Sequence, residues 1–116
     1  MSTRVRSLRN DGAMEIRPGL GLDEAVLAEF CQRRQIRRLM LFGSALRADF
    51  RSDSDVDVLV EFRPGAEPGL LRIAQMELEL GELLGGREVE MRTYEDLSPY
   101  FRDAVREQAT TLYDAA

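Results

Sequence analysis

Two runs near the middle of the chain decide its fold: Leu41-Phe42-Gly43-Ser44-Ala45-Leu46-Arg47 and, after a polar loop, Asp53-Ser54-Asp55-Val56-Asp57-Val58-Leu59-Val60. The first run predicts the end of a strand, a tight turn and the start of a short helix. The second run predicts a loop that leads into a buried strand. Because side chains alternate between the two faces of a strand, Asp55 and Asp57 point to one face, and Val56 and Val58 point to the other.

The two aspartates on one strand face predict a polar site at one end of the sheet. Neighbouring carboxylates repel each other, so this pair is favoured either where solvent wets the sheet end or around a divalent cation. Gly43 and Ser44 add backbone N–H groups at a helix start, where a phosphate binds well. A phosphate site beside two carboxylates is what metal-assisted phosphoryl or nucleotidyl transfer needs. The alternative is a polar turn followed by two exposed aspartates.

The composition indicates a single folded domain over residues 1–116. The chain is 44% hydrophobic and 32% charged, with a formal net charge of −5. This length favours one domain rather than two. The negative charge argues against direct nucleic-acid binding, which requires a basic face. Residues 1–20 show no sustained hydrophobic period, so we expect a flexible N-terminal arm there.

The residue types that are missing from the sequence exclude several kinds of site. The chain has no histidine, and its 16 basic residues are all arginine. A Ser-His-Asp triad, a histidine zinc site, Schiff-base chemistry and a lysine-dependent phosphate loop are therefore excluded. The single cysteine, Cys31, cannot form an internal disulfide, which fits a reducing compartment. Without a long apolar run or a signal-peptide core, we expect a cytoplasmic protein with no membrane contact.

The hydrophobic pattern predicts an alternation of helices and strands. The expected helices cover residues 23–34, 70–84 and 99–108, the expected strands cover 36–42, 55–62 and 87–93, and the tail at 110–113 is either helical or strand-like. The residues predicted to face the core are Val26, Leu27, Phe30 and Cys31 in the first helix and Phe101, Ala104 and Val105 in the last.

Two charged features leave more than one interpretation open. Glu77 falls inside the otherwise apolar arc of the helix at 70–84, where it either pairs with an arginine or faces a partner. Four arginines cluster around the start of the strand at 36–42: Arg33, Arg34, Arg37 and Arg38. This basic cluster is either a solvated edge or a contact for an acidic partner.

The two central runs resemble the nucleotidyltransferase core of the DNA polymerase β superfamily, especially its minimal, stand-alone members. Gly43 and Ser44 match the Gly-Ser turn, Arg47 matches the family's arginine, and Ser54, Asp55 and Asp57 match its Ser-Asp-x-Asp block. The segment at 84–90 resembles the part of the family that carries the third carboxylate, here Glu90. The segments at 97–103 and 112–113 resemble the closing helix of the MntA-type antitoxins, so the similarity covers about residues 23–113.

The resemblance implies a small α/β (α+β) fold, the minimal nucleotidyltransferase fold, with a mixed β-sheet and helices packed mainly on one face. It implies that Asp55, Asp57 and Glu90 are catalytic and hold Mg²⁺, with two ions expected, and that Gly43, Ser44, Arg47 and Ser54 bind the phosphates of ATP. Antitoxins of this group transfer AMP from ATP to a tyrosine of a HEPN-domain RNase toxin. A HEPN toxin is therefore the implied partner, and a hetero-oligomer the implied assembly.

Three departures from the family's pattern keep two other functions open. Ala45-Leu46 stands where Arg-Ala is more usual, Ala48 replaces a glycine, and Glu90 replaces the third aspartate. A catalytically weak binding module would neutralise its partner by occlusion alone. A nucleotidyltransferase that acts on a small molecule would need a further domain to hold its acceptor, for which this length leaves little room.

Overall fold

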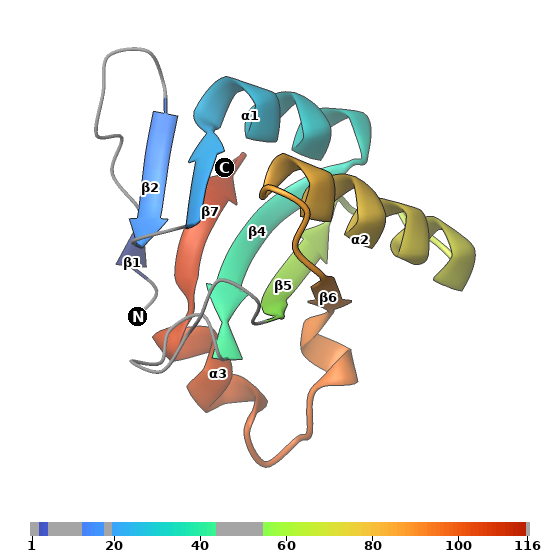
Figure 1. Ribbon diagram of the computed structural model, residues 1–116. Coiled ribbons are helices and arrows are strands. Elements are labelled where there is room, and N and C mark those ends of the chain that lie inside the picture. Colours follow the sequence, from blue (N-terminus) through green and yellow to red (C-terminus); the bar gives the residue numbers. More distant parts are fainter. Residues whose placement is uncertain (1–2, 5–12, 18–19, 44–54, 116) are drawn as a thin grey trace.

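The computed structural model describes residues 3–4, 13–17, 20–43 and 55–115 of the chain. The elements are β1 (Thr3–Arg4), β2 (Ala13–Arg17), β3 (Leu20–Asp23), α1 (Glu24–Arg33), β4 (Ile36–Phe42), β5 (Val56–Phe62), α2 (Leu70–Leu83), β6 (Val89–Arg92), a 3₁₀ helix (Tyr94–Asp96), α3 (Arg102–Gln108) and β7 (Thr110–Asp114) (Figure 1). None of the helices in this described part has the length and apolar character that crossing a membrane requires.

A five-stranded mixed sheet forms the centre of the molecule, in the order β1-β7-β4-β5-β6. β4 pairs antiparallel with both β5 and β7, whereas β6 is parallel to β5 and β1 is parallel to β7. The predicted mixed sheet is therefore confirmed, and the three predicted strands correspond to β4, β5 and β6. The tail at 110–113, for which the sequence allows either a helix or a strand, forms β7 beside β4.

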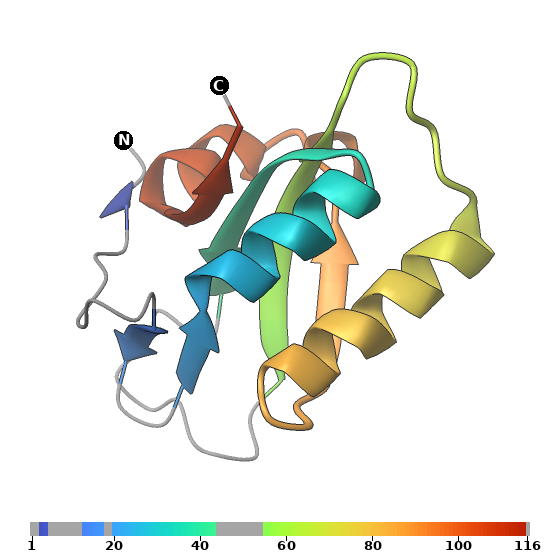
Figure 2. The ribbon, with the colours of Figure 1, turned by 90° about the horizontal axis from the view of Figure 1, so that it is seen from above.

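The helices α1 and α2 lie side by side on one face of the sheet (Figure 2). Their buried side chains, which include Phe30 and Met76, form one core with Leu41 and Val58 of the sheet. A smaller cluster lies on the opposite face, where Met40, Leu59 and Ala109 are buried against Phe42 and Leu97. The prediction that helices pack mainly on one face is confirmed, because α3 is the only α-helix of the described ranges that lies toward the other face (Figure 1).

The N-terminal residues contain strands that the hydrophobic pattern did not predict. β2 and β3 pair antiparallel in a second, two-stranded sheet, and β3 leads directly into α1. β1 pairs with the start of β7. These strands are two to five residues long, which is too short to give a sustained period. The flexibility of an arm at residues 1–20 stays a prediction. The described part of this segment contains strands.

The start of α1 is set by the side chain of Asp23. Its carboxylate accepts hydrogen bonds from the backbone N–H groups of Ala25 and Val26 at 2.9 and 3.1 Å, so the residue acts as the N-cap. Leu27, Phe30 and Cys31 are buried as predicted, whereas Val26 is 40% exposed. Val26 lies about 100° around the helix from Leu27 and therefore falls at the border of the buried stripe.

All four arginines of the basic cluster pair with carboxylates of their own chain. Glu79 of α2 pairs with Arg33 and Arg34, and Glu61 of β5 pairs with Arg37 and Arg38. The hydrogen bonds from Arg33 and then Arg34 lower the pKa of the Glu79 carboxyl. Glu79 thereby connects α1 to α2. The solvated-edge interpretation of the cluster fits this pairing better than a contact for an acidic partner does.

The C-terminal helix differs most from its prediction. α3 begins at Arg102 and contains no buried residue, and Phe101, which was predicted to face inward, is 66% exposed. Ala104 is also exposed, while Val105 is only half-buried. The predicted apolar stripe of this helix was therefore wrong at Phe101 and Ala104.

Charged and aromatic contacts hold α3 instead. The guanidinium groups of Arg102 and Arg106 lie 4.8 and 5.3 Å from the centroid of the Tyr94 ring, within the range of cation–π attraction. Arg106 also pairs with Glu61 at 3.3 Å, and the Tyr94 hydroxyl donates to Asp103. Hydrophobic periodicity does not detect such contacts, which explains the error.

Cys31 provides a test of the core under α1. Its side chain is fully buried, and this burial raises the pKa of the thiol to about 12. Because the thiolate is the reactive form, we expect Cys31 of the folded protein to react with a disulfide reagent at pH 8 on the order of 1,000-fold more slowly than free cysteine. Absorbance follows the labelling in native buffer and in guanidinium, where the unfolded chain exposes Cys31 and serves as the reference for a free thiol. Equal rates in the two buffers would contradict the buried position.

Candidate active site

The turn after β4 brings a glycine into contact with an aspartate. Gly43 has φ +72°, in the left-handed region that favours glycine. The residue before it, Phe42, is the register partner of Asp57 on β5. A Cβ placed on Gly43 would lie 2.5 Å from the Oδ2 atom of Asp57. The backbone conformation therefore favours glycine at this position, and a side chain here would displace the Asp57 carboxylate.

The Asp-x-Asp pair lies at the beginning of a buried strand, as its pattern predicted. Asp55 is exposed just before β5, Asp57 is half-buried inside the strand, and Leu59 is fully buried two residues further on. Val56 and Val58 point to the opposite face and pack in the core under the helices. The polar face of β5 therefore turns apolar within one further pair of residues.

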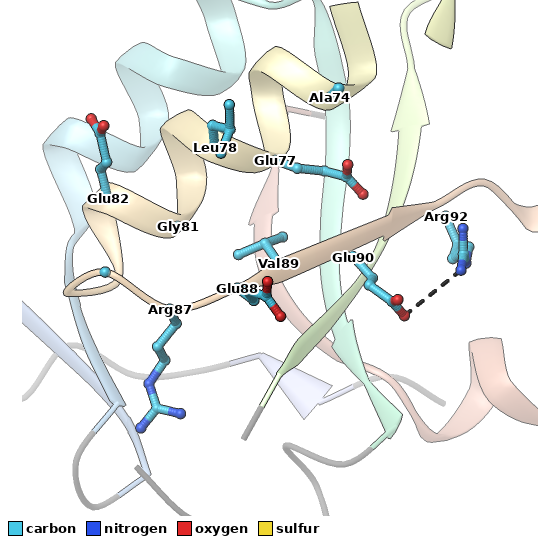
Figure 3. A pocket seen from close by; sticks show the side chains of 11 residues that line it. Ala74, Glu77, Leu78, Gly81, Glu82, Arg87, Glu88, Val89, Glu90 and Arg92 are labelled. Carbon is cyan, nitrogen blue, oxygen red and sulfur yellow. Dashed lines mark ion pairs between the residues drawn. The ribbon is translucent and has the colours of Figure 1, made fainter. Parts of the chain in front are cut away.

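Glu90 lies next to Asp57 in the neighbouring strand. The parallel register of β5 and β6 pairs Asp57 with Glu90 and Val58 with Met91. Residues paired in this way point to the same face of a sheet, so Glu90 shares the face of the two aspartates. Its side chain is 52% exposed and forms an ion pair with Arg92 at 3.7 Å (Figure 3). The register therefore places Glu90 on the face of the aspartates, and its role as the third carboxylate stays a prediction.

The donor atoms fit the metal that the resemblance implies, but they are not gathered around one point. Carboxylate oxygens are the ligands that Mg²⁺ prefers. In the ranges that the structure describes, no three Asp, Glu, His or Cys side chains lie close enough together to hold one ion. Ser44, Arg47 and Ser54, which were predicted to bind phosphate, lie outside those ranges. Their roles, and a metal site that includes Glu90, stay predictions.

Glu77, which the sequence left unexplained, covers the free edge of β6. Val56 N–H donates to the Glu88 carbonyl, so the alternate residue Met91 turns its N–H away from β5. The Glu77 carboxylate accepts a hydrogen bond from that N–H at 2.8 Å. Glu77 therefore pairs with a backbone group rather than with an arginine. Only a sequence reading that already places β6 at the edge of the sheet would have found this contact.

A groove of about 720 Å³ lies between α2 and β6. The helix contributes Ala74, Leu78 and Gly81 to its wall, and the strand and its approach contribute Arg87, Glu88 and Glu90 (Figure 3). Neither Asp55 nor Asp57 lines it. The groove therefore adjoins the candidate site through Glu90 without containing the aspartate pair.

Comparison with known proteins decides the family. The sequence model of the nucleotidyltransferase domain family matches residues 24–111 of the chain. This chain belongs to the nucleotidyltransferase family. The match runs from the start of α1 into β7, and it includes Gly43, Asp55, Asp57 and Glu90. The family resemblance and the enzyme class that the sequence predicted are both confirmed.

Two relatives carry the name of protein adenylyltransferases. A protein of Methanocaldococcus jannaschii assigned to this activity is 36% identical over 77 residues, which cover 66% of this chain and 80% of the relative. Protein adenylyltransferase MntA of Thermococcus cleftensis is 41% identical over 59 residues, covering 51% of this chain and 58% of the relative. The chain therefore spans little more than half the length of that MntA protein.

Solved structures support the fold. A structure assigned as a minimal nucleotidyltransferase is 36% identical, with a TM-score of 0.61 and coverage of 77% of this chain and 88% of the other. A toxin–antitoxin structure with AMP-PNP has a TM-score of 0.63 at 18% identity and covers 80% of this chain and 74% of the other. At that identity the second likeness shows the fold alone. The minimal nucleotidyltransferase fold is thus confirmed.

Proposed function

We propose that this chain is the antitoxin of a toxin–antitoxin pair and that it transfers AMP from ATP to a tyrosine of a HEPN-domain RNase toxin. The observation that carries the proposal is the sheet end where Asp57 lies against Gly43 and beside Glu90. The adenylyltransferase names of the relatives support the reaction. The toxin–antitoxin structure with AMP-PNP supports both the kind of partner and the nucleotide.

Two groups of residues would carry such a transfer, one binding the metal and the other binding the phosphates. Asp55, Asp57 and Glu90 are the residues that would hold Mg²⁺. When bound, the metal supplies charge neutralisation for the phosphates and for the oxygens that attack and leave. The phosphates of ATP would lie on the Gly43 turn, with donors from Ser44, Arg47 and Ser54.

The chemistry of the step suits a tyrosine acceptor. The hydroxyl oxygen of the acceptor forms a bond to the α-phosphorus of ATP, the bond to pyrophosphate breaks, and the hydroxyl proton passes to a carboxylate such as Glu90. Tyrosine has an ordinary pKa near 10, so its proton is easier to remove than that of serine. The exposed side chain of Glu90 leaves room for an acceptor from another protein.

Mapping of the transferred group tests the proposal. The chain is incubated with a HEPN-domain RNase toxin, labelled ATP and Mg²⁺, and the label is located by mass spectrometry. We expect AMP on a tyrosine of the toxin, and loss of the toxin's RNase activity in step with labelling. Label on no protein, together with full silencing of the toxin, would contradict the proposed transfer.

A binding module that silences its partner by occlusion is the second candidate. The pairing of Glu90 with Arg92 favours it, since an ion pair occupies this carboxylate and no three acidic side chains in the described ranges lie close enough to hold one ion. Under this alternative the toxin would be silenced equally well without ATP. Omitting the nucleotide from the silencing assay therefore separates the two candidates.

A pair of variants tests whether Glu90 is catalytic. We expect Glu90→Gln to lower the rate of AMP transfer by about 100-fold with little change in thermal stability, because an amide cannot take a proton or balance a cation. Arg92→Gln is the control, since it removes the same ion pair and leaves the carboxylate. Equal rates for the two variants would assign Glu90 to the ion pair alone.

A further inference from the structure

We infer that the outward face of α2, together with the groove along β6, is the docking surface for the protein that this enzyme modifies. We define the α2 face by its exposed apolar residues: Leu70, Leu71, Ala74 and Leu78. The partner that fits it presents a helix with an apolar stripe flanked by basic residues. The inference rests on the proposed function, because it assumes that the acceptor is a protein.

The first argument is that α2 has two apolar faces. Met76 and Leu80 are buried on the core side, whereas Leu70, Leu71 and Leu78 are 87%, 75% and 73% exposed. Residues four and seven positions apart lie on the same side of a helix. Leu70, Ala74 and Leu78 follow each other at intervals of four, and Leu71 lies seven positions before Leu78, so the four residues form one strip. They are three of the six large apolar residues that are exposed in the described chain. A surface helix usually carries polar residues there, and an apolar strip of this kind marks an interaction site.

The second argument is that the strip adjoins the candidate active site. Ala74 and Leu78 belong both to the α2 face and to the wall of the groove. The same groove reaches Glu90 and Arg92 on β6 (Figure 3). A partner seated on the α2 face therefore lies beside the carboxylate that is in register with Asp57. Docking at this place would bring an acceptor side chain to the reacting groups.

The third argument is the charge of the groove. Four carboxylates and two arginines line it: Glu77, Glu82, Glu88, Glu90, Arg87 and Arg92. Glu77 accepts a hydrogen bond from the Met91 backbone N–H, and Glu90 forms an ion pair with Arg92. Glu82 and Glu88 form no ion pair with the residues that the structure describes. We call Glu82 and Glu88 the acidic rim of the groove. A partner with complementary charge would carry basic residues opposite this rim.

The fourth argument selects a helix rather than a strand as the docked element. A strand would have to pair with the free edge of β6. There the Met91 N–H already donates to Glu77, and the Thr93 N–H donates to Asp96 at 3.0 Å. These carboxylates occupy donors that an added strand needs, and they block edge pairing. An apolar strip beside a groove is instead the geometry that receives an amphipathic helix.

The test measures binding of a HEPN-domain RNase toxin, by calorimetry on the full chain. We expect Leu71→Asp/Leu78→Asp to weaken binding by about 100-fold, since central apolar contacts carry most of an interface's affinity. Phe101→Asp is the matched control, because it changes another exposed apolar residue, and it should bind as the wild type does. Circular dichroism and Mg·ATP affinity confirm that the leucine variant is folded and keeps its nucleotide site.

The charge of the rim is tested in the same assay. Glu82→Lys/Glu88→Lys should weaken binding by at least about tenfold at low salt, and the difference from the wild type should shrink as salt is added. Glu107→Lys/Glu95→Lys is the control, because these exposed carboxylates make the same charge change away from the groove. Equal weakening by both double variants would show a general charge effect and would count against the acidic rim as a contact.

The outcomes separate this inference from the proposed function. If Asp55→Asn/Asp57→Asn binds the toxin without transferring AMP, while the leucine variant does neither, both proposals stand. If the leucine variant binds and is active like the wild type, the docking surface is wrong and the function stands. If the wild type does not bind the toxin, both fail. A wild-type dimer that the leucine variant lacks, with toxin binding unchanged, would assign the α2 face to a second copy of the chain.

Discussion

Replacing Asp55 and Asp57 together by asparagine is expected to abolish AMP transfer and to leave the fold intact. An amide is close to a carboxylate in size, but it cannot balance the charge of Mg²⁺, so the rate should fall by at least about 1,000-fold. Stability should not fall, since two neighbouring carboxylates repel each other when no metal is bound. Transfer of labelled AMP, Mg·ATP affinity by calorimetry and thermal melting measure the three expectations.

A second double variant controls for the change in net charge. Glu95→Gln/Glu107→Gln also removes two negative charges, from exposed positions outside the candidate site. It should transfer AMP at the wild-type rate. If the aspartate double variant keeps the wild-type Mg·ATP affinity and rate, then the pair has no catalytic role. The Gly-Ser and Asp-x-Asp pattern would in that case mark the fold and not an active site.

The sheet and the two helices on its main face could be predicted because apolar burial decides them. The bounds of β4 match the prediction, and those of β5 and α2 match within one residue. Their apolar residues recur at the period of the element that they form, and this is the signal that a sequence carries most clearly. α3 could not be predicted in the same way, since Tyr94, Arg102 and Arg106 hold it by contacts that have no period.

The candidate site also has parts that local sequence patterns predict and parts that they do not. That Asp55 and Asp57 share one strand face could be predicted from alternation alone, because Val56 and Val58 on the other face pack in the core under the helices. The position of Glu90 came from a family resemblance, and the register of β5 and β6 places it beside Asp57. The contact between Gly43 and Asp57 could not be predicted, since it depends on the antiparallel register of β4 and β5. A local sequence pattern does not predict which residues of two strands lie opposite each other.

That contact makes Gly43→Ala the single substitution with the largest expected effect on both stability and activity. The left-handed φ of residue 43 costs alanine about 1–2 kcal/mol. The added Cβ would also lie 2.5 Å from the Asp57 carboxylate, so the carboxylate has to move. We expect the melting temperature to fall by roughly 10 °C and AMP transfer to fall by at least about 100-fold, because small displacements of catalytic groups are costly.

Gly65→Ala separates the two causes of this loss. Gly65 also has a positive φ, +85°, but a Cβ placed there meets nothing within 4 Å. It should therefore lose stability through the backbone alone, by about 1 kcal/mol, and keep its transfer rate. Melting curves and rates of labelled AMP transfer, both measured well below the melting temperature of each variant, provide the comparison. If the two alanine variants lose stability and activity equally, the approach of Asp57 to residue 43 has no bearing on catalysis.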